Sequence, residues 1–174
     1  EADCQTLITQ AVQTFGRIDV LINNAGISMR ALFNDLDLDV LRNLMDVNFW
    51  GTVYCTKYAM PEILKSKGSI VGVSSIAGYR GLPGRTGYSA SKFAMNGFME
   101  SLRTEVLHSG VHVMVACPGF TASNIRVAAL AKDGSAHGET SMEEGEMMTA
   151  EEVAHHMIEG IAARKRTLVM TAQG

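Results

Sequence analysis

Short apolar runs alternate with amphipathic helical stretches along this chain, and this alternation limits the possible folds more than any other feature. Four runs have the length and composition of buried strands: residues 20–23, 69–75, 111–116 and 167–170. Unbroken apolar strands are typical of a parallel sheet that is covered on both faces. Because a helical stretch separates each run from the next, the sequence predicts an α/β fold with a doubly wound parallel sheet and right-handed crossovers.

The helical stretches are recognised by apolar residues three or four positions apart and by end signals. They are residues 6–15, 37–65, 87–108 and 149–163. Gly16 follows the first stretch at the place where a helix end favours a residue with positive φ. Pro61 is expected to kink or divide the second stretch. Thr149 and Glu152 have the spacing of a capping box, which predicts the start of the last helix.

Residues 124–148 form a polar segment that contains glycine and methionine and has no clear periodicity, although 125–132 could be a short helix. We interpret it as a flexible flap over a binding cleft, and a disordered surface loop is the equal alternative. Met142, Met147 and Met148 could adapt to a bulky apolar ligand, because unbranched thioether side chains are flexible. The flap therefore favours an apolar carbonyl or alcohol as the small-molecule substrate.

Composition excludes several classes of protein. With 174 residues and no linker-like segment, the chain is expected to form a single domain over residues 1–174. A net charge of −3 without a basic block argues against nucleic acid as a partner. Three widely spaced cysteines fit neither a disulfide framework nor a zinc site, so we expect no metal and, by default, a cytoplasmic location. No apolar run reaches the roughly 20 residues that cross a bilayer, so we expect no membrane segment in this chain.

Polar motifs follow one another where predicted strands end and helices begin. They are Asn23-Asn24-Ala25-Gly26, Asn48, Ser75, Tyr88-x-x-x-Lys92 and Pro118-Gly119. In this order the motifs resemble those of the short-chain dehydrogenase/reductase family, and the resemblance covers nearly the whole chain. It implies a Rossmann-type fold, NAD or NADP as the cofactor, and an oxidoreductase that interconverts a carbonyl and a secondary alcohol by hydride transfer.

Tyr88 and Lys92 have a chemical relationship that follows from their spacing alone. Residues four apart share one face of a helix, so both side chains can point into one cleft at the carboxyl edge of the sheet. A neighbouring ammonium favours the phenolate, which predicts a pKa for Tyr88 below the usual value of about 10. Tyr88 would then serve as a general acid and base.

The resemblance assigns further roles. Ser75 would hydrogen-bond the substrate oxygen, whereas Ser74 should point to the other side of its strand. Asn48 would hold a water that continues the proton relay from Lys92. The residues that would contact the cofactor lie after the first and third strands or on the tyrosine helix: Asn24, Ala25, Gly26, Tyr88, Lys92, Pro118, Gly119, Thr121 and Ser123.

The glycine-rich turn with which the family begins does not occur in this sequence. We therefore expect that the first strands of the sheet belong to a preceding segment that this chain lacks, which leaves the strand at 20–23 as an open edge. That segment also sets the choice between NAD and NADP and could carry a membrane anchor. The resemblance further implies a homodimer or homotetramer. Two alternatives remain open: a catalytically inert binding or scaffold domain, and an epimerase or dehydratase.

Overall fold

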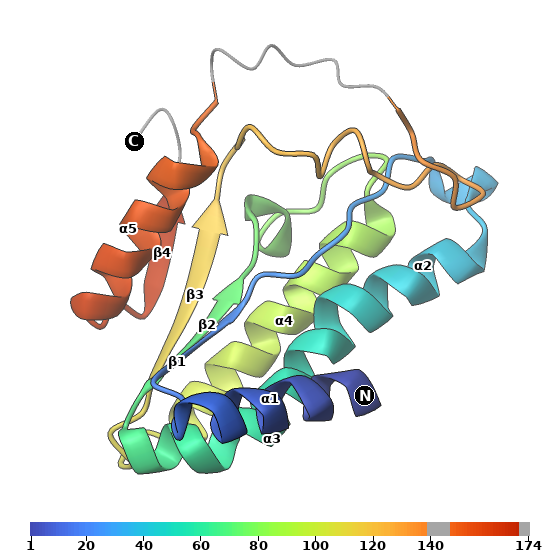
Figure 1. Ribbon diagram of the computed structural model, residues 1–174. Coiled ribbons are helices and arrows are strands. Elements are labelled where there is room, and N and C mark those ends of the chain that lie inside the picture. The colour runs from blue at the N-terminus through green and yellow to red at the C-terminus, as the bar shows by residue number, and fades with distance from the viewer. Residues whose placement is uncertain (139–146, 171–174) are drawn as a thin grey trace.

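Four parallel strands form the sheet of the computed structural model, which describes residues 1–138 and 147–170 (Figure 1). The strands are β1 (Val20–Asn23), β2 (Ser69–Val73), β3 (His112–Pro118) and β4 (Thr167–Met170), and they lie in the order β1-β2-β3-β4. Every pair is parallel, with Val20 beside Ser69 and Ser69 beside His112. The short parallel sheet with flanking helices confirms the predicted α/β, Rossmann-type fold class.

The helices occur close to the predicted positions. They are α1 (Ala2–Phe15), α2 (Leu38–Met45), α3 (Gly51–Ser66), α4 (Thr86–Glu105) and α5 (Ala150–Ala162), with the short turns η1 (Phe33–Asp35), η2 (Asp46–Trp50) and η3 (Ile76–Gly78). Gly16 ends α1 with φ 77°, as expected. The capping box is also confirmed, because Thr149 Oγ1 accepts from Glu152 N at 3.1 Å and a Glu152 carboxylate oxygen accepts from Thr149 N at 2.8 Å.

The stretch predicted as one helix over residues 37–65 is divided, but not at the proline. Pro61 lies within α3, and the break is η2, one turn of π-helix between α2 and α3. A π-turn inserts one residue into the helical repeat and commonly occurs at functional sites. Here it turns Asn48 toward the interior of the molecule, where its side chain is fully buried.

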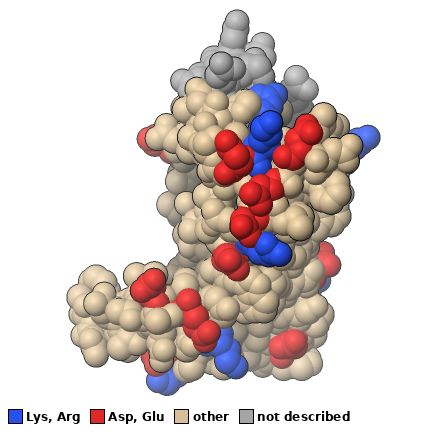
Figure 2. Space-filling view, turned by 90° about the vertical axis from the view of Figure 1, so that its right-hand side faces the viewer, with Lys and Arg blue, Asp and Glu red and all other residues tan. Residues whose placement is uncertain are grey.

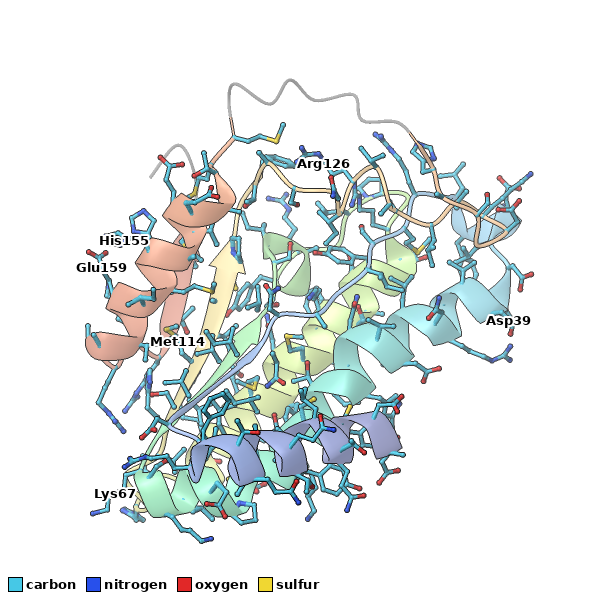
Figure 3. All side chains as sticks on the ribbon, viewed as in Figure 1. Asp39, Lys67, Met114, Arg126, His155 and Glu159 are labelled. Atoms are coloured by element: carbon cyan, nitrogen blue, oxygen red, sulfur yellow. The ribbon has the colours of Figure 1, made fainter. Side chains whose placement is uncertain are left out.

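The two faces of the sheet are covered unequally (Figure 1). Helices α1, α3 and α4 pack on one face, and their core includes Ile63, Met95 and Met99. Among the described helices, α5 alone covers the other face, where Met114 of β3 packs in one cluster with α5 (Figure 3). Two apolar side chains of β1 are therefore about two-fifths exposed: Val20 (43%) and Ile22 (41%). Among the described strands β1 is an edge, as expected.

The segment that follows β3 is not helical over residues 125–132, so the predicted short helix was wrong; the chain forms turns there. The backbone of this segment forms hydrogen bonds with the segment after β1 instead of the hydrogen bonds of a helix. Leu130 N donates to Ser28 O at 2.8 Å, and Arg30 N donates to Leu130 O at 2.8 Å. Met148 packs against the α5 side of the sheet, whereas Met142 lies outside the described residues.

The face on the α2 side carries acidic and basic side chains next to one another, with neither sign dominating (Figure 2). One pair at α2 is Arg42 with Asp39, at 2.6 Å. Across residues 1–138 and 147–170, no helix is both long enough and apolar enough to span a membrane.

Candidate active site

Tyr88 and Lys92 lie on the first two turns of α4, on the face turned toward the sheet. Tyr88 is 8% exposed and Lys92 is 3% exposed. Lys92 Nζ lies 5.8 Å from the centre of the Tyr88 ring and donates a hydrogen bond of 2.9 Å to Val73 O, at the carboxyl end of β2. The spacing of four residues thus brings both groups to the predicted edge of the sheet.

Burial dominates the protonation of both groups. It lowers the pKa of Lys92 to about 8, and the nearby Cys117 opposes this shift only in part. Burial also raises the pKa of Tyr88, against the opposing effects of the nearby Ser75 hydroxyl and the charge of Arg85. The expected lowering of the Tyr88 pKa was therefore wrong for this structure, because desolvation of the phenolate outweighs its favourable partners.

Ser75 stands at the end of β2, close enough to the Tyr88 phenol to oppose the rise of its pKa. Its hydroxyl accepts a hydrogen bond of 3.2 Å from Ala77 N and so caps η3, which holds the side chain in one orientation. Ser74 is buried near the thiol of Cys117. Of the two serines, Ser75 is the one that acts on the pKa of Tyr88.

Asn48 ties the segment after β1 to α4 through three hydrogen bonds. Its Oδ1 accepts from Ile27 N at 2.8 Å, while its Nδ2 donates to Ile27 O and to Ser91 Oγ, both at 2.9 Å. Both amide hydrogens are thus used by the protein. The backbone carbonyl of Asn48 accepts from Thr52 Oγ1 at 3.0 Å. The side chain acts first as a clamp, and the oxygen atoms are the part of Asn48 with acceptor capacity left for a water.

Gly26 occupies the point where these groups converge. A β-carbon at this position would lie 3.3 Å from Asn48 Oδ1 and 3.4 Å from Lys92 Nζ, which is closer than most side-chain contacts. Asn24 and Ala25, which precede it, are exposed. A side chain at position 26 would therefore crowd both Asn48 Oδ1 and Lys92 Nζ, which explains the glycine.

The residues after β3 lie at the same edge of the sheet but are not drawn into the hydrogen-bonded cluster. Gly119 N donates to Met170 O at the end of β4, and Thr121 Oγ1 donates to Gly119 O at 3.3 Å. Pro118 is half-buried, and Ser123 lies exposed in a turn. The structure thus brings Asn48, Ser75, Tyr88 and Lys92 together with Gly26, and places the other predicted cofactor residues along the rim.

Comparison with known proteins agrees with this geometry. The sequence profile of the family described as short chain dehydrogenase matches residues 1–134, which is more than half of the chain. The chain belongs to the short-chain dehydrogenase family. It is 38% identical over 163 residues to dehydrogenase/reductase SDR family member 7B of Mus musculus, which covers 93% of this chain and 50% of the relative.

Two further relatives are similar over shorter lengths. The 11-beta-hydroxysteroid dehydrogenase A of Arachis hypogaea is 43% identical over 143 residues, which is 82% of this chain and 40% of that protein. Dehydrogenase/reductase SDR family member 7 of Homo sapiens is 48% identical over 120 residues, which is 67% of this chain and 35% of that protein. The chain spans about half the length, or less, of the curated relatives that it matches.

Three residues of this short-chain dehydrogenase site were missed by the sequence analysis. Ser91 joins Asn48 to α4 and donates to Tyr88 O at 2.8 Å, and Cys117 lies close enough to influence the pKa of both Tyr88 and Lys92. The positive charge of Arg85 acts to lower the pKa of Tyr88. Neither Arg85 nor Cys117 gave a signal in the sequence, because the first lies just before α4 with a non-helical backbone and the second is a lone cysteine in a strand.

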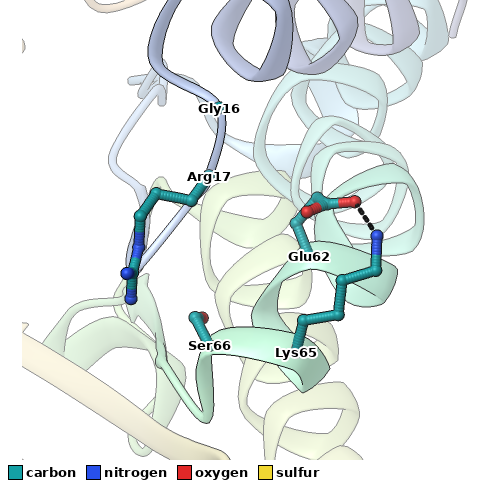
Figure 4. A pocket seen from close by; sticks show the side chains of 5 residues that line it. All are labelled: Gly16, Arg17, Glu62, Lys65 and Ser66. Carbon is teal, nitrogen blue, oxygen red and sulfur yellow. Dashed lines mark hydrogen bonds and ion pairs between the residues drawn. The ribbon is translucent and has the colours of Figure 1, made fainter.

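A surface pocket lies away from this site (Figure 4). It is lined by Gly16, Arg17, Glu62, Lys65 and Ser66, which lie at the ends of α1 and α3 beside the amino edge of the sheet. Lys65 and Glu62 pair with each other at 2.6 Å. Within the described residues no three His, Cys, Asp or Glu side chains are placed to hold a metal ion. The pocket therefore offers no chemistry comparable with that of the carboxyl edge.

Proposed function

We propose that this chain carries the reacting groups of an NAD(P)-dependent oxidoreductase that interconverts a carbonyl and a secondary alcohol. The observation that supports it best is the placing of Lys92 Nζ 5.8 Å from the centre of the Tyr88 ring, with both side chains buried at the carboxyl edge where Ser75 follows β2. These groups supply an acid, a hydrogen-bond donor and a cation at one edge of the sheet. Membership of an oxidoreductase family and relatives named as dehydrogenases support the same reaction.

Tyr88 would act as the proton donor to a carbonyl oxygen. Because burial raises its pKa, the phenol is protonated at neutral pH and is ready to donate. Ser75 would donate a hydrogen bond to the same oxygen and stabilise the negative charge that develops on it. In the direction of alcohol oxidation the same tyrosine would accept the proton.

Lys92 and the rim residues would position the dinucleotide, which supplies or accepts the hydride when it is bound. The glycine at position 26 would let the nicotinamide ring lie beside Lys92, because a larger residue there would crowd the ammonium. The residues that would hold the cofactor are Asn24, Ala25, Gly26, Tyr88, Lys92, Pro118, Gly119, Thr121 and Ser123. Lys92 would be charged at pH values below its pKa of about 8 and would return a proton to Tyr88 by way of a water at Asn48.

The proposed substrate is a moderately bulky carbonyl or alcohol with an apolar body. A homodimer or homotetramer and a cytoplasmic location remain predictions. The alternative of an inert scaffold would require the buried groups of the carboxyl edge to have no role beyond stability.

Removal of the Tyr88 hydroxyl tests the proposal. Tyr88→Phe should lower kcat/KM for NADH- or NADPH-driven ketone reduction by about 10³-fold, the usual contribution of a positioned general acid. Binding of the dinucleotide, followed by its fluorescence, should stay within about threefold of the wild type, since the phenyl ring keeps its packing.

Tyr58→Phe is the matched control for that measurement. Tyr58 donates to Glu1 at 2.7 Å at the contact of α1 with α3, far from the carboxyl edge, so its loss should leave kcat/KM unchanged. A Tyr88→Phe enzyme with turnover within tenfold of the wild type would remove the tyrosine from the mechanism and favour the scaffold alternative.

A further inference from the structure

Asn96 lies on the same face of α4 as Tyr88 and Lys92, one helical turn beyond the lysine. Residues four apart along a helix share one face, so the three side chains form a row along α4. Asn96 is 6% exposed, and its Nδ2 donates a hydrogen bond of 2.9 Å to Gly78 O, in the turn that follows β2. The proposed chemistry of the site gives this buried amide no role.

Two side chains of α4 hold the backbone on either side of Ser75. Lys92 Nζ donates to Val73 O, two residues before the serine, at 2.9 Å. Asn96 Nδ2 donates to Gly78 O, three residues after the serine. The backbone that carries Ser75 is therefore attached on both sides to α4, which also carries the tyrosine.

The turn η3 connects Gly78 to the serine hydroxyl. Gly78 N donates to Ser75 O at 2.9 Å, and Ala77 N donates to Ser75 Oγ at 3.2 Å. Because both hydrogen bonds run from η3 back to the serine, a displacement of η3 would also move the hydroxyl. The orientation of the Ser75 side chain thus depends on where η3 lies against α4.

Gly78 packs directly on α4 through its backbone. A β-carbon at this position would lie 2.7 Å from Ser74 Oγ, 2.8 Å from Asn96 Nδ2 and 3.0 Å from Lys92 O. Only glycine permits so close an approach. The contact between η3 and α4 at this point is therefore a backbone contact, and the Asn96 amide is the hydrogen-bond donor that fixes it.

The amide of Asn96 contributes little net stability. A hydrogen bond between neutral groups contributes about 1 kcal/mol, and a buried polar atom without a partner costs about 1–3 kcal/mol. Asn96 Oδ1 is buried and has no partner among the described residues. An apolar replacement would remove this unpaired oxygen but leave Gly78 O unpaired, so the two costs nearly cancel. Stability therefore does not explain the amide.

We propose that Asn96 is a positioning residue, which holds η3 against α4 and so directs the Ser75 hydroxyl toward the substrate oxygen that Tyr88 protonates. A displacement of about 1 Å in a group that stabilises a transition state can remove much of its effect. This inference rests on the proposed function, since it assumes that Ser75 acts on the reacting oxygen.

Steady-state kinetics of Asn96→Leu in the full-length protein tests the positioning role. Leucine is close to asparagine in shape, so the midpoint of urea denaturation should shift little. The kcat for reduction of acetophenone by NADH or NADPH should fall about tenfold or more, while KM for the dinucleotide stays within about twofold of the wild type.

Two further variants support this measurement. Asn96→Ser removes the hydrogen bond without adding apolar bulk, because the serine hydroxyl is one bond too short to reach Gly78 O, and it should lower kcat to a similar extent. Asn43→Leu makes the same chemical change as Asn96→Leu at an exposed position of α2 and should leave kcat unchanged.

A double-mutant cycle with Ser75→Ala separates positioning from a purely structural role. Ser75→Ala alone should lower kcat about 10²-fold. If Asn96 acts through the serine hydroxyl, Asn96→Leu should change kcat by less than about twofold in the Ser75→Ala background. The same tenfold loss in both backgrounds would overturn the inference.

Amide hydrogen exchange tests the same connection without requiring turnover. In Asn96→Leu the amide of Ala77, which is bonded to Ser75 Oγ, should exchange about tenfold faster than in the wild type, whereas the amides of β3 should not change. Unchanged exchange at Ala77 would also overturn the inference. A wild-type protein that reduces no ketone would contradict the proposed function, and the exchange of Ala77 would still decide whether Asn96 holds η3.

Discussion

The two edges of the sheet are built in different ways. At the carboxyl edge, Asn48 and Lys92 are almost wholly buried and form hydrogen bonds to backbone and side chains. At the amino edge, Arg17 pairs with Asp19 and Lys65 pairs with Glu62, and only Glu62 of these four side chains is mostly covered (Figure 4). Asn48 and Lys92 thus lie where desolvation costs free energy, whereas the charged pairs of the amino edge lie where water solvates them.

This difference indicates where selection for function has acted. An exposed ion pair contributes between zero and about 1 kcal/mol and is easily replaced. A buried ammonium without a carboxylate partner reduces stability, so it persists only where it has another use. The amino edge holds the pocket of Figure 4 and a buried titratable side chain, His112, whereas Tyr88 and Lys92, whose pKa values burial shifts, lie together at the carboxyl edge. Chemistry rather than cavity size identifies the site.

Replacing Lys92 should have the largest effect at the carboxyl edge. Lys92→Met should abolish measurable ketone reduction, since the proposed mechanism needs its charge, and should also increase the free energy of unfolding at pH 7. The shift of the lysine pKa from 10.5 to about 8 corresponds to a loss of about 3 kcal/mol in the free energy of unfolding. The hydrogen bond from Lys92 to Val73 O, which the variant lacks, offsets about 1 kcal/mol of that loss. Urea denaturation of the two proteins measures the difference.

The pH dependence of the difference in unfolding free energy between Lys92→Met and the wild type provides the control. Because the folded-state pKa of Lys92 is lowered, the penalty is complete below about pH 8 and disappears as the pH rises toward 10.5. The stability advantage of Lys92→Met should therefore shrink between pH 7 and pH 9.5. An advantage that is the same at both pH values would show that the burial of the charge is not its cause.

Removing the Asn48 clamp should have the next largest effect. Asn48→Ala leaves Ile27 N, Ile27 O and Ser91 Oγ without their buried partner, and should lower the free energy of unfolding by about 3 kcal/mol. Ketone reduction by the folded fraction should also fall, because the segment that carries Gly26 is no longer held against α4. Asn43→Ala, in an exposed position of α2, is the matched control and should change neither property.

The strands and the tyrosine–lysine helix could be predicted because their determinants are local. Apolar runs define the strands, and a spacing of four residues places Tyr88 and Lys92 on one face. The carboxyl ends of parallel strands meet at one edge, so the assembly of Ser75 with that helix also followed from the pattern. Each of these inferences needs only the chain and the geometry of its elements.

The remaining features depend on contacts that no local pattern encodes. The π-turn that buries Asn48 is stabilised by hydrogen bonds to Ile27, which is distant in sequence. The sequence therefore predicted the division of the helix at Pro61, which was wrong. The shift of the Tyr88 pKa depends on how deeply the ring is buried. Likewise, the turns over residues 125–132 replace a possible helix because Leu130 finds backbone partners near Ser28.

The smallest effect is expected at the amino edge. Lys65→Gln removes the ion pair with Glu62, but Lys65 is 71% exposed, so the free energy of unfolding should change by about 0.5 kcal/mol or less and kcat/KM should not change. Urea denaturation at low and at 1 M salt measures the first quantity, since salt screens whatever attraction the pair retains. A loss of more than about 2 kcal/mol, or any loss of turnover, would mean that the charged pairs of the amino edge are constrained as well. The contrast between the two edges would then reflect exposure alone and not function.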